Sequence, residues 1–298
     1  MRVFVTGATG FVGSAVVEDL MAGGHDVIGL ARSDRSAERL ATIGVTVHRG
    51  DLASPETLQA GAQAADAVIH TAFLHDFTRF AACCAMDKAA VETLGAALEG
   101  TEKPLLVTAG VAFLPTADRV ATESDAAAAP TSQYPRASEA AAAAHADRGI
   151  RASVMRLPPS VHGHGDYGFV PILIGLARER GFSAYIGDGA NLWSAVHRYD
   201  AARAYRHAIE QGARGETFHA VAEDGVPFRD IAAAIAIGLG MPCAAISPDA
   251  AGEHFGWFAP FAALDQPASS AKTREQLGWQ PTHPTLLNDI GSARYFEA

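Results

Sequence analysis

Cysteine is scarce in this chain of 298 residues, which contains only three. Cys83 and Cys84 are adjacent and Cys243 is distant, so the sequence has neither a disulfide framework nor a CxxC metal site. The pair His162 and His164 has no further ligand at a recognised spacing, and we predict no metal. This cysteine usage fits a reducing compartment, so we expect a cytoplasmic location.

Long apolar runs and clusters of positive charge are absent as well. No stretch of about 18 consecutive apolar residues occurs, so we expect no membrane-spanning helix. The 23 Lys and Arg residues are outnumbered by 33 Asp and Glu residues, and no basic run interrupts the net charge of -10. A phosphate-backbone partner needs positive charge, so we expect a small-molecule substrate and no nucleic acid. With 49% hydrophobic residues, the chain can bury the core of one large or two modest domains.

Short apolar runs alternate with stretches of helical spacing through the first half of the chain. Residues 2–30 read as strand, glycine turn, helix and strand, which is a βαβ unit. Further apolar runs of strand length follow at 45–47, 67–70, 105–108, 153–156 and 217–221. We therefore predict an α/β fold with a doubly wound parallel sheet, the Rossmann arrangement. A nearly polyalanine stretch at 135–148 predicts one of its helices.

The alternation is lost after Pro158 and Pro159, where glycine, proline and aromatic residues become frequent. This change predicts a second, smaller lobe. We assign residues 1–162 and 193–224 to a dinucleotide-binding domain, and residues 163–192 and 225–298 to a C-terminal substrate lobe.

Gly7, Gly10 and Gly13 form a GxxGxxG pattern between the first predicted strand and helix. In such a pattern, the first glycine permits the tight turn and the second lets the backbone approach a pyrophosphate. The third allows close helix packing, and the helix N-terminus favours negative charge. A glycine triplet alone can be a structural turn, but the surrounding βαβ unit favours a dinucleotide site.

Six segments in order resemble the short-chain dehydrogenase/reductase superfamily, in its extended NAD(P)-dependent epimerase/dehydratase branch. They are VTGATGFVG (5–13), GDL (50–52), VIHTAF (68–73), Tyr134 ahead of an alanine-rich helix, RLPPSVHG (156–163) and AVHRYDAARA (195–204). The resemblance implies that Asp51 and Leu52 lie by the adenine and residues 71–73 by the phosphates and ribose. It also implies that residues 158–161 lie by the nicotinamide.

The end of the second predicted strand bears on the choice of cofactor. An NAD site usually has an acidic residue there for the ribose 2′-OH, whereas this chain has Arg32, Ser33 and Arg35. Two guanidinium groups and a hydroxyl suit a 2′-phosphate, so we predict NADP(H). The alternative is that Asp34 and Glu38 simply balance two solvated arginines. The predicted cofactor contacts are Gly7, Thr9, Gly10, Phe11, Val12, Gly13, Arg32, Ser33, Arg35, Asp51, Leu52, Thr71, Ala72, Phe73, Pro158 and Val161.

The superfamily's catalytic groups are matched only in part. Its members usually carry a Ser or Thr after the fifth strand and a Tyr-x-x-x-Lys, and here Tyr134 is followed by Ser138 in place of the lysine. We predict Tyr134, Thr108 and Ser138 as catalytic residues, although Gly110 aligns with the usual hydroxyl. A phenol with a pKa of about 10 stays neutral without a nearby cation, so Tyr134 suits an acid better than a base. Arg136, two residues further on, would point away on a helix.

Several other side chains are candidates for contact with substrate. The alternative is that Tyr134 is a packing or substrate-contact aromatic residue and that Thr108 is simply the last residue of a strand. Histidines then become the candidate acids or bases. The aromatic cluster in the second lobe is expected to wall an apolar pocket, to form the core of that lobe or to cover a homodimer surface; its members are Phe255, Trp257, Phe258 and Phe261. The predicted substrate contacts are His162, His197, Arg198 and Trp257.

Together these features predict an NADP(H)-dependent oxidoreductase. It would move hydride between the nicotinamide and a carbonyl or alcohol of a small, partly apolar substrate. Two alternatives remain at this stage. One is a nucleotide-sugar epimerase or dehydratase, which the lost lysine disfavours. The other is an NADP-binding sensor or regulator without catalytic activity.

Overall fold

A seven-stranded parallel sheet organises the larger part of the molecule, which is a computed structural model that describes residues 1–116, 119–132, 134–211, 214–292 and 295–297. The strand order is β10-β6-β5-β4-β1-β2-β3, and every neighbouring pair is parallel. The strands are β1 (Arg2–Thr6), β2 (Asp26–Ala31), β3 (Thr46–Arg49), β4 (Ala67–His70), β5 (Leu105–Gly110), β6 (Ala152–Leu157) and β10 (Thr217–His219). The predicted doubly wound α/β fold is confirmed.

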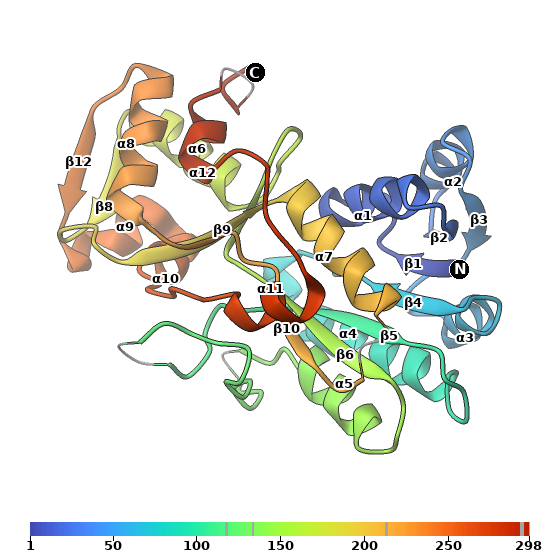
Figure 1. The fold of residues 1–298 in the computed structure, drawn as a ribbon. Coiled ribbons are helices and arrows are strands. Elements are labelled where there is room, and N and C mark those ends of the chain that lie inside the picture. The colour runs from blue at the N-terminus through green and yellow to red at the C-terminus, as the bar shows by residue number, and fades with distance from the viewer. Residues whose placement is uncertain (117–118, 133, 212–213, 293–294, 298) are drawn as a thin grey trace.

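Helices cover both faces of this sheet (Figure 1). One face carries α1 (Phe11–Ala22), α2 (Asp34–Thr42) and α7 (Arg198–Glu210), and α1 and α7 pack closely together. The other face carries α3 (Pro55–Gln63), α4 (Phe80–Ala96) and α5 (Ser138–Ala146). Because both faces are covered, the strands are apolar on both sides.

Strand β1 illustrates this two-sided burial. Val3 and Val5 pack toward α1 and α7, whereas Phe4 between them packs toward α3 and α4. All three side chains are fully buried. A Cβ atom on Gly61 of α3 would lie 2.4 Å from the Phe4 ring, so the missing side chain lets α3 approach the sheet.

The second lobe extends beyond the carboxyl ends of these strands. Its core is rich in aromatic residues, including Trp193, Phe228, Phe255 and Phe258. Its helices are α6 (Phe169–Arg180), α8 (Phe228–Leu239), α9 (Ala251–Phe255), α10 (Ala259–Ala262) and α12 (Leu286–Ile290). A two-stranded sheet joins β8 (Ser183–Ile186) and β12 (Cys243–Ile246), and a three-stranded sheet joins β7 (Ser160–His162), β9 (Leu192–His197) and β11 (Glu223–Pro227). Helix α11 (Ala271–Leu277) packs instead on α7 and β10.

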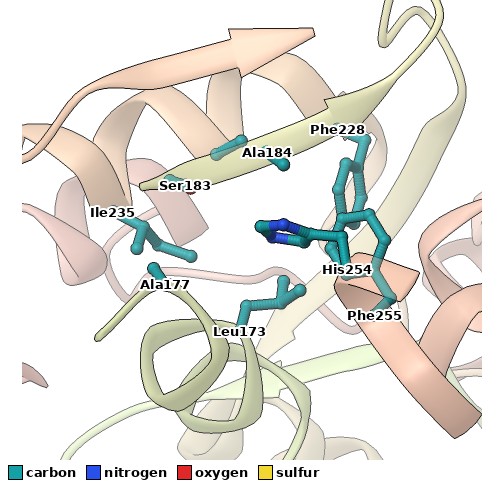
Figure 2. A pocket seen from close by; sticks show the side chains of 9 residues that line it. Leu173, Ala177, Ser183, Ala184, Phe228, Ile235, His254 and Phe255 are labelled. Carbon is teal, nitrogen blue, oxygen red and sulfur yellow. The ribbon is translucent and has the colours of Figure 1, made fainter. Parts of the chain in front are cut away.

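The core of this lobe contains one small cavity, into which the imidazole of His254 points (Figure 2). Leu173, Phe228 and Ile235 are among the side chains that surround it. Its volume of about 10 Å³ is close to the minimum for a single water molecule. The second lobe is therefore closely packed at this point, and the cavity is too small for a substrate. In the described part of the chain, no helix has both the length and the hydropathy to cross a membrane.

A buried ion pair fixes the start of α5 against the sheet. Arg156 of β6 is only 1% exposed, and its Nε donates to Oε2 of Glu139 at 3.0 Å. Its Nη2 also donates to Glu139 and to the carbonyl of Asp125. These bonds compensate a guanidinium charge that would otherwise be costly to bury.

Replacing Glu139 with glutamine should strongly destabilise the protein, because the charge of Arg156 stays buried without its partner. We expect a loss of about 3–5 kcal/mol in the free energy of unfolding, measured by urea denaturation. The matched control is Glu92→Gln on α4, which breaks an exposed pair with Lys88 and should cost less than about 1 kcal/mol. Equal losses in the two variants would contradict the assignment.

Candidate active site

One cavity of about 520 Å³ lies along the carboxyl ends of the parallel strands and continues to the second lobe. Residues that follow β1, β2, β3 and β4 line one end of it, and residues from the ends of β5 and β6 line the middle. In open α/β sheets this edge is where ligands bind. Every predicted cofactor contact lines the cavity except Ser33 and Arg35.

The glycine turn after β1 is too tight for side chains. Gly7 has a φ of +71°, and a Cβ atom on it would lie 2.7 Å from the backbone nitrogen of Ala72. A Cβ atom on Gly13 would lie 2.0 Å from the carbonyl oxygen of Gly7. Gly10 differs, because its φ is -73° and its nearest fixed neighbour would be 3.1 Å away. Gly7 and Gly13 thus form the turn, and Gly10 leaves its surface open.

Helix α1 begins at this turn without a side-chain cap. The backbone N–H of Phe11 donates instead to the hydroxyl of Tyr167 at 3.0 Å, and the two rings meet edge to face. Tyr167 is 64% exposed. A bare helix N-terminus with backbone N–H groups facing a cavity suits an anion. The residues present therefore fit a dinucleotide, with its pyrophosphate at Gly10, Phe11 and Val12.

A positively charged side chain lies at the far end of the cavity, beyond β2. Arg32 is largely exposed, and its Nε lies 3.8 Å from a carboxylate oxygen of Asp51. Arg39 of α2, which the sequence did not single out, donates to the carbonyl of Thr9 at 3.2 Å. Arg39 therefore holds the loop that carries the glycine pattern.

The two predicted contacts outside the cavity have other surroundings. The Ser33 hydroxyl caps α2 by accepting a bond from the N–H of Ser36. Arg35 lies in the first turn of α2 with its side chain exposed. Ser36 lines the cavity, although the sequence did not indicate it.

Tyr134 lines the middle of the cavity, between the rings of Phe80 and Phe113. Burial raises the pKa of the Tyr134 phenol above its ordinary value, and the opposing effect of the nearby Arg136 charge is smaller. The phenol is therefore protonated at neutral pH and can donate a hydrogen bond or a proton. Phe113 has a φ of +65°, a strained backbone conformation for a residue of this size.

Arg136 lies beside Tyr134 in the cavity, contrary to the expectation from helical spacing. Helix α5 begins only at Ser138, so Tyr134 and Arg136 belong to the preceding loop and the helical argument does not apply. The Nε of Arg136 donates to the Ser138 hydroxyl at 3.1 Å, and Nη2 donates to the carbonyl of Thr108 at 3.1 Å. Its guanidinium lies 4.6 Å from the ring centroid of Phe73.

Ser138 is buried and does not line the cavity. Its hydroxyl donates to one oxygen of Asp87, and the other oxygen lies 3.1 Å from Nε2 of His70. Nδ1 of His70 in turn lies 2.8 Å from the Thr6 hydroxyl. Burial alone would raise the pKa of Asp87, but hydrogen bonds from His70 and Ser138 lower it overall. A buried carboxylate thus anchors Arg136 through Ser138.

Thr108 lines the cavity at the end of β5. Its hydroxyl lies 2.7 Å from the carbonyl of His70, to which it donates, and 2.7 Å from the hydroxyl of Tyr205. Gly110, where the superfamily alignment expects a hydroxyl, also lines the cavity.

The histidines and the arginine predicted near substrate lie behind the cavity. His162 is fully buried, with Nδ1 2.9 Å from Asp289. His197 stacks on His283, and burial lowers the pKa of His197 to about 4. Arg198 donates to Ser14 of α1 at 2.9 Å and covers the Phe11 ring. None of the three lines the cavity.

The end of the cavity next to the second lobe is walled by aromatic rings. Trp257 stacks on Phe77 at its outer edge but is 53% exposed and does not line it. Of the aromatic cluster near residue 257, Phe255 and Phe258 belong to the lobe core. The sequence missed most of this wall, because its members come from separate segments. The lining side chains here are Phe73, Leu74, His75, Phe77, Phe80, Phe113, Phe169, Ile172 and Phe261.

Replacing Gly10 with valine should abolish dinucleotide binding without unfolding the protein. The valine side chain would occupy the surface that the pyrophosphate must approach, while the φ of -73° at Gly10 suits a side chain and the Cβ contact of 3.1 Å to the Gly7 carbonyl oxygen requires only a small shift of the backbone. Titration of NADPH and NADH by fluorescence measures the first effect, and thermal unfolding measures the second. Gly175→Val on α6, where nothing lies within 4 Å, serves as the control that retains binding. Unchanged affinity in folded Gly10→Val would refute the site.

Comparisons with known proteins agree with this geometry. Residues 3–221 match the model of the NAD dependent epimerase/dehydratase family. The chain is 45% identical to an uncharacterized protein of Schizosaccharomyces pombe over 99% of this chain and 100% of the relative. It is 29% identical to a 4-hydroxy-2-methyl-3-oxo-4-farnesyl-3,4-dihydroquinoline-1-oxide ketoreductase of Stigmatella aurantiaca, over 76% and 69% of the two chains.

The fold is also similar to that of DesIV, a dTDP-glucose 4,6-dehydratase from Streptomyces venezuelae solved with NAD bound. The TM-score is 0.77 at 21% identity, over 99% of this chain and 97% of the other. Family match, fold and glycine turn together lead to one conclusion: the chain belongs to the NAD-dependent epimerase/dehydratase family.

Proposed function

We propose that this protein is an NADP(H)-dependent reductase, which transfers hydride to the carbonyl of a small, largely apolar substrate. The observation that carries the proposal is a single cavity that joins the glycine turn, the Tyr134 phenol and an aromatic wall. Hydride transfer needs these three parts together, because cofactor, proton donor and carbonyl must come within contact distance.

The protonation of Tyr134 favours reduction over the reverse reaction. Burial raises its pKa, so the phenol holds its proton at neutral pH and can give it to a carbonyl oxygen. An oxidation would require the phenolate, which this environment disfavours. The same property argues against a sugar epimerase, because that reaction begins with an oxidation.

The aromatic wall supports an apolar substrate instead of a nucleotide sugar. The diphosphate of a nucleotide sugar needs several cationic or N–H donors to bind it. Among the described residues, Arg136 is the single arginine or lysine that lines this end of the cavity. The Stigmatella relative is named a ketoreductase of a dihydroquinoline oxide, which is consistent with carbonyl reduction.

The proposed preference for NADP(H) depends on Arg32. Arg32 lines the cavity, is 67% exposed and lies no closer than 3.8 Å to Asp51, so its guanidinium is available for a 2′-phosphate.

Replacing Arg32 with alanine should weaken NADPH binding by roughly 1–3 kcal/mol and leave NADH binding nearly unchanged. The change removes a charge-assisted hydrogen bond that only the 2′-phosphate can accept. Calorimetry with both cofactors measures the effect, and Arg35→Ala is the matched control because Arg35 does not line the cavity. If wild-type protein binds NADH as tightly as NADPH, the preference for NADP(H) is wrong.

Replacing Tyr134 with phenylalanine should lower kcat by about 10²–10⁴ and leave NADPH affinity unchanged, because only the transferable proton is lost. In the wild type, reduction should persist through neutral pH and decline only above about pH 10, since the pKa of Tyr134 is raised. Turnover of a panel of ketones with NADPH provides the measurement.

Two results of that assay would redirect the proposal. A Tyr134→Phe variant with wild-type kcat would exclude the phenol as the acid. Tight NADPH binding without reduction of any ketone in the panel would instead favour a sensor that binds the cofactor without catalysis.

A further inference from the structure

We propose that the substrate carries a carboxylate close to its carbonyl group and that Arg136 binds this carboxylate. The inference rests on the proposed function and names its substrate class, a 2-oxo acid with an apolar remainder.

Arg136 has donors but no ion-pair partner. Its guanidinium donates hydrogen bonds to two neutral acceptors, the Ser138 hydroxyl and the Thr108 carbonyl. No carboxylate of the described residues lies within ion-pair distance of its guanidinium. A partly buried arginine that lines a cavity in this state is suited to an incoming anion, and its planar fork can bind a carboxylate with two parallel bonds.

The nearest negative charge lies behind Arg136 and not in the cavity. Asp87 is 2% exposed and is already bonded to His70 and to Ser138. It positions the arginine without occupying the side that faces the cavity. Among the described residues, the carboxylates that line the cavity are Asp51, near Arg32, and Asp166, which accepts a hydrogen bond from Tyr295.

The surroundings of Arg136 make a single charge pair effective. Its guanidinium covers the face of Phe73, and the rings of Phe80 and Phe113 lie around the adjacent Tyr134. His75, the nearest titratable base, is held neutral because burial and the Arg136 charge lower its pKa. In such an apolar environment, attraction between opposite charges is stronger than in water.

The positions of Arg136 and Tyr134 determine how far apart the carboxylate and the carbonyl of the substrate can be. Tyr134 and Arg136 are two residues apart in the loop before α5 and both line the cavity, so a ligand bonded to both must carry its anionic group near the carbonyl. Bound NADPH, held at the glycine turn, would supply the hydride for the carbonyl carbon and would leave as NADP⁺. The carbonyl π bond breaks as its oxygen takes the Tyr134 proton, which water then restores, and the product is a hydroxy acid.

Binding to the oxidised complex tests this proposal without turnover. Protein saturated with NADP⁺, which cannot reduce a ketone, is titrated by calorimetry with benzoylformate and with 2-oxohexanoate. Each acid is compared with its methyl ester, which keeps the 2-oxoacyl group, adds one methyl group and carries no charge. We expect at least one acid to bind about 10- to 100-fold more tightly than its ester, as a charge-assisted pair requires.

Two variants of Arg136 and one control complete the test. Arg136→Gln should abolish the preference for the acid, and Arg136→Lys should restore part of it. NADP⁺ affinity should be the same in all variants. Arg79→Gln, which removes an exposed charge paired with Asp76, should leave the preference intact.

The proposal is overturned if neither acid binds more tightly than its ester, or if the preference survives in Arg136→Gln. Equal loss of acid and ester turnover in Arg136→Gln would also overturn it, because Arg136 would then act through Tyr134 or the carbonyl. Failure of the protein to bind NADP⁺ would instead refute the proposed function. The two hypotheses therefore fail in distinguishable ways.

Discussion

The buried carboxylate of Asp87 is the interaction on which the active-site geometry depends. Asp87 lies on α4. Its carboxylate is hydrogen-bonded to Ser138, the first residue of α5, and to His70, the last residue of β4. The other ring nitrogen of His70 is hydrogen-bonded to the hydroxyl of Thr6, the residue just before Gly7. One set of buried hydrogen bonds thus joins the glycine turn to the loop of Tyr134. Because unpaired buried charges are costly, the set resists partial rearrangement.

This arrangement explains how the site accommodates a serine at the position where the superfamily resemblance implies a lysine. Ser138 is too short to reach the cavity, but it gives Arg136 an acceptor that is itself oriented by a carboxylate. The positive charge beside Tyr134 therefore comes from Arg136 in the loop before α5, and not from a residue of the helix itself. An arginine keeps its charge even when partly buried, whereas a lysine in the same surroundings can lose its proton.

The sheet could be predicted from the sequence because its strands are buried on both faces and read as continuous apolar runs, as at Ala67–His70. The glycine turn was predictable because its constraint is local. Arg136 was not, since the position of α5 depends on Asp87, which lies 51 residues before Ser138. The short strands of the second lobe were missed for a similar reason. Strand β9 mixes Trp193 with polar residues, and only tertiary contacts bury them.

The two ends of the cavity are formed in different ways, and this difference bears on substrate selection. The end at the glycine turn is formed by residues that follow β1, β2, β3 and β4, all between Gly7 and Phe73, so its shape follows from one continuous part of the sequence. The aromatic end combines Phe77 before α4, Phe113 after β5, Phe169 at the start of α6 and Phe261 of α10. The shape of this end depends on the position of the second lobe. Buried contacts such as the one between His162 and Asp289 fix the elements of that lobe. Substitutions at that junction can therefore alter substrate selection while the cofactor site stays intact.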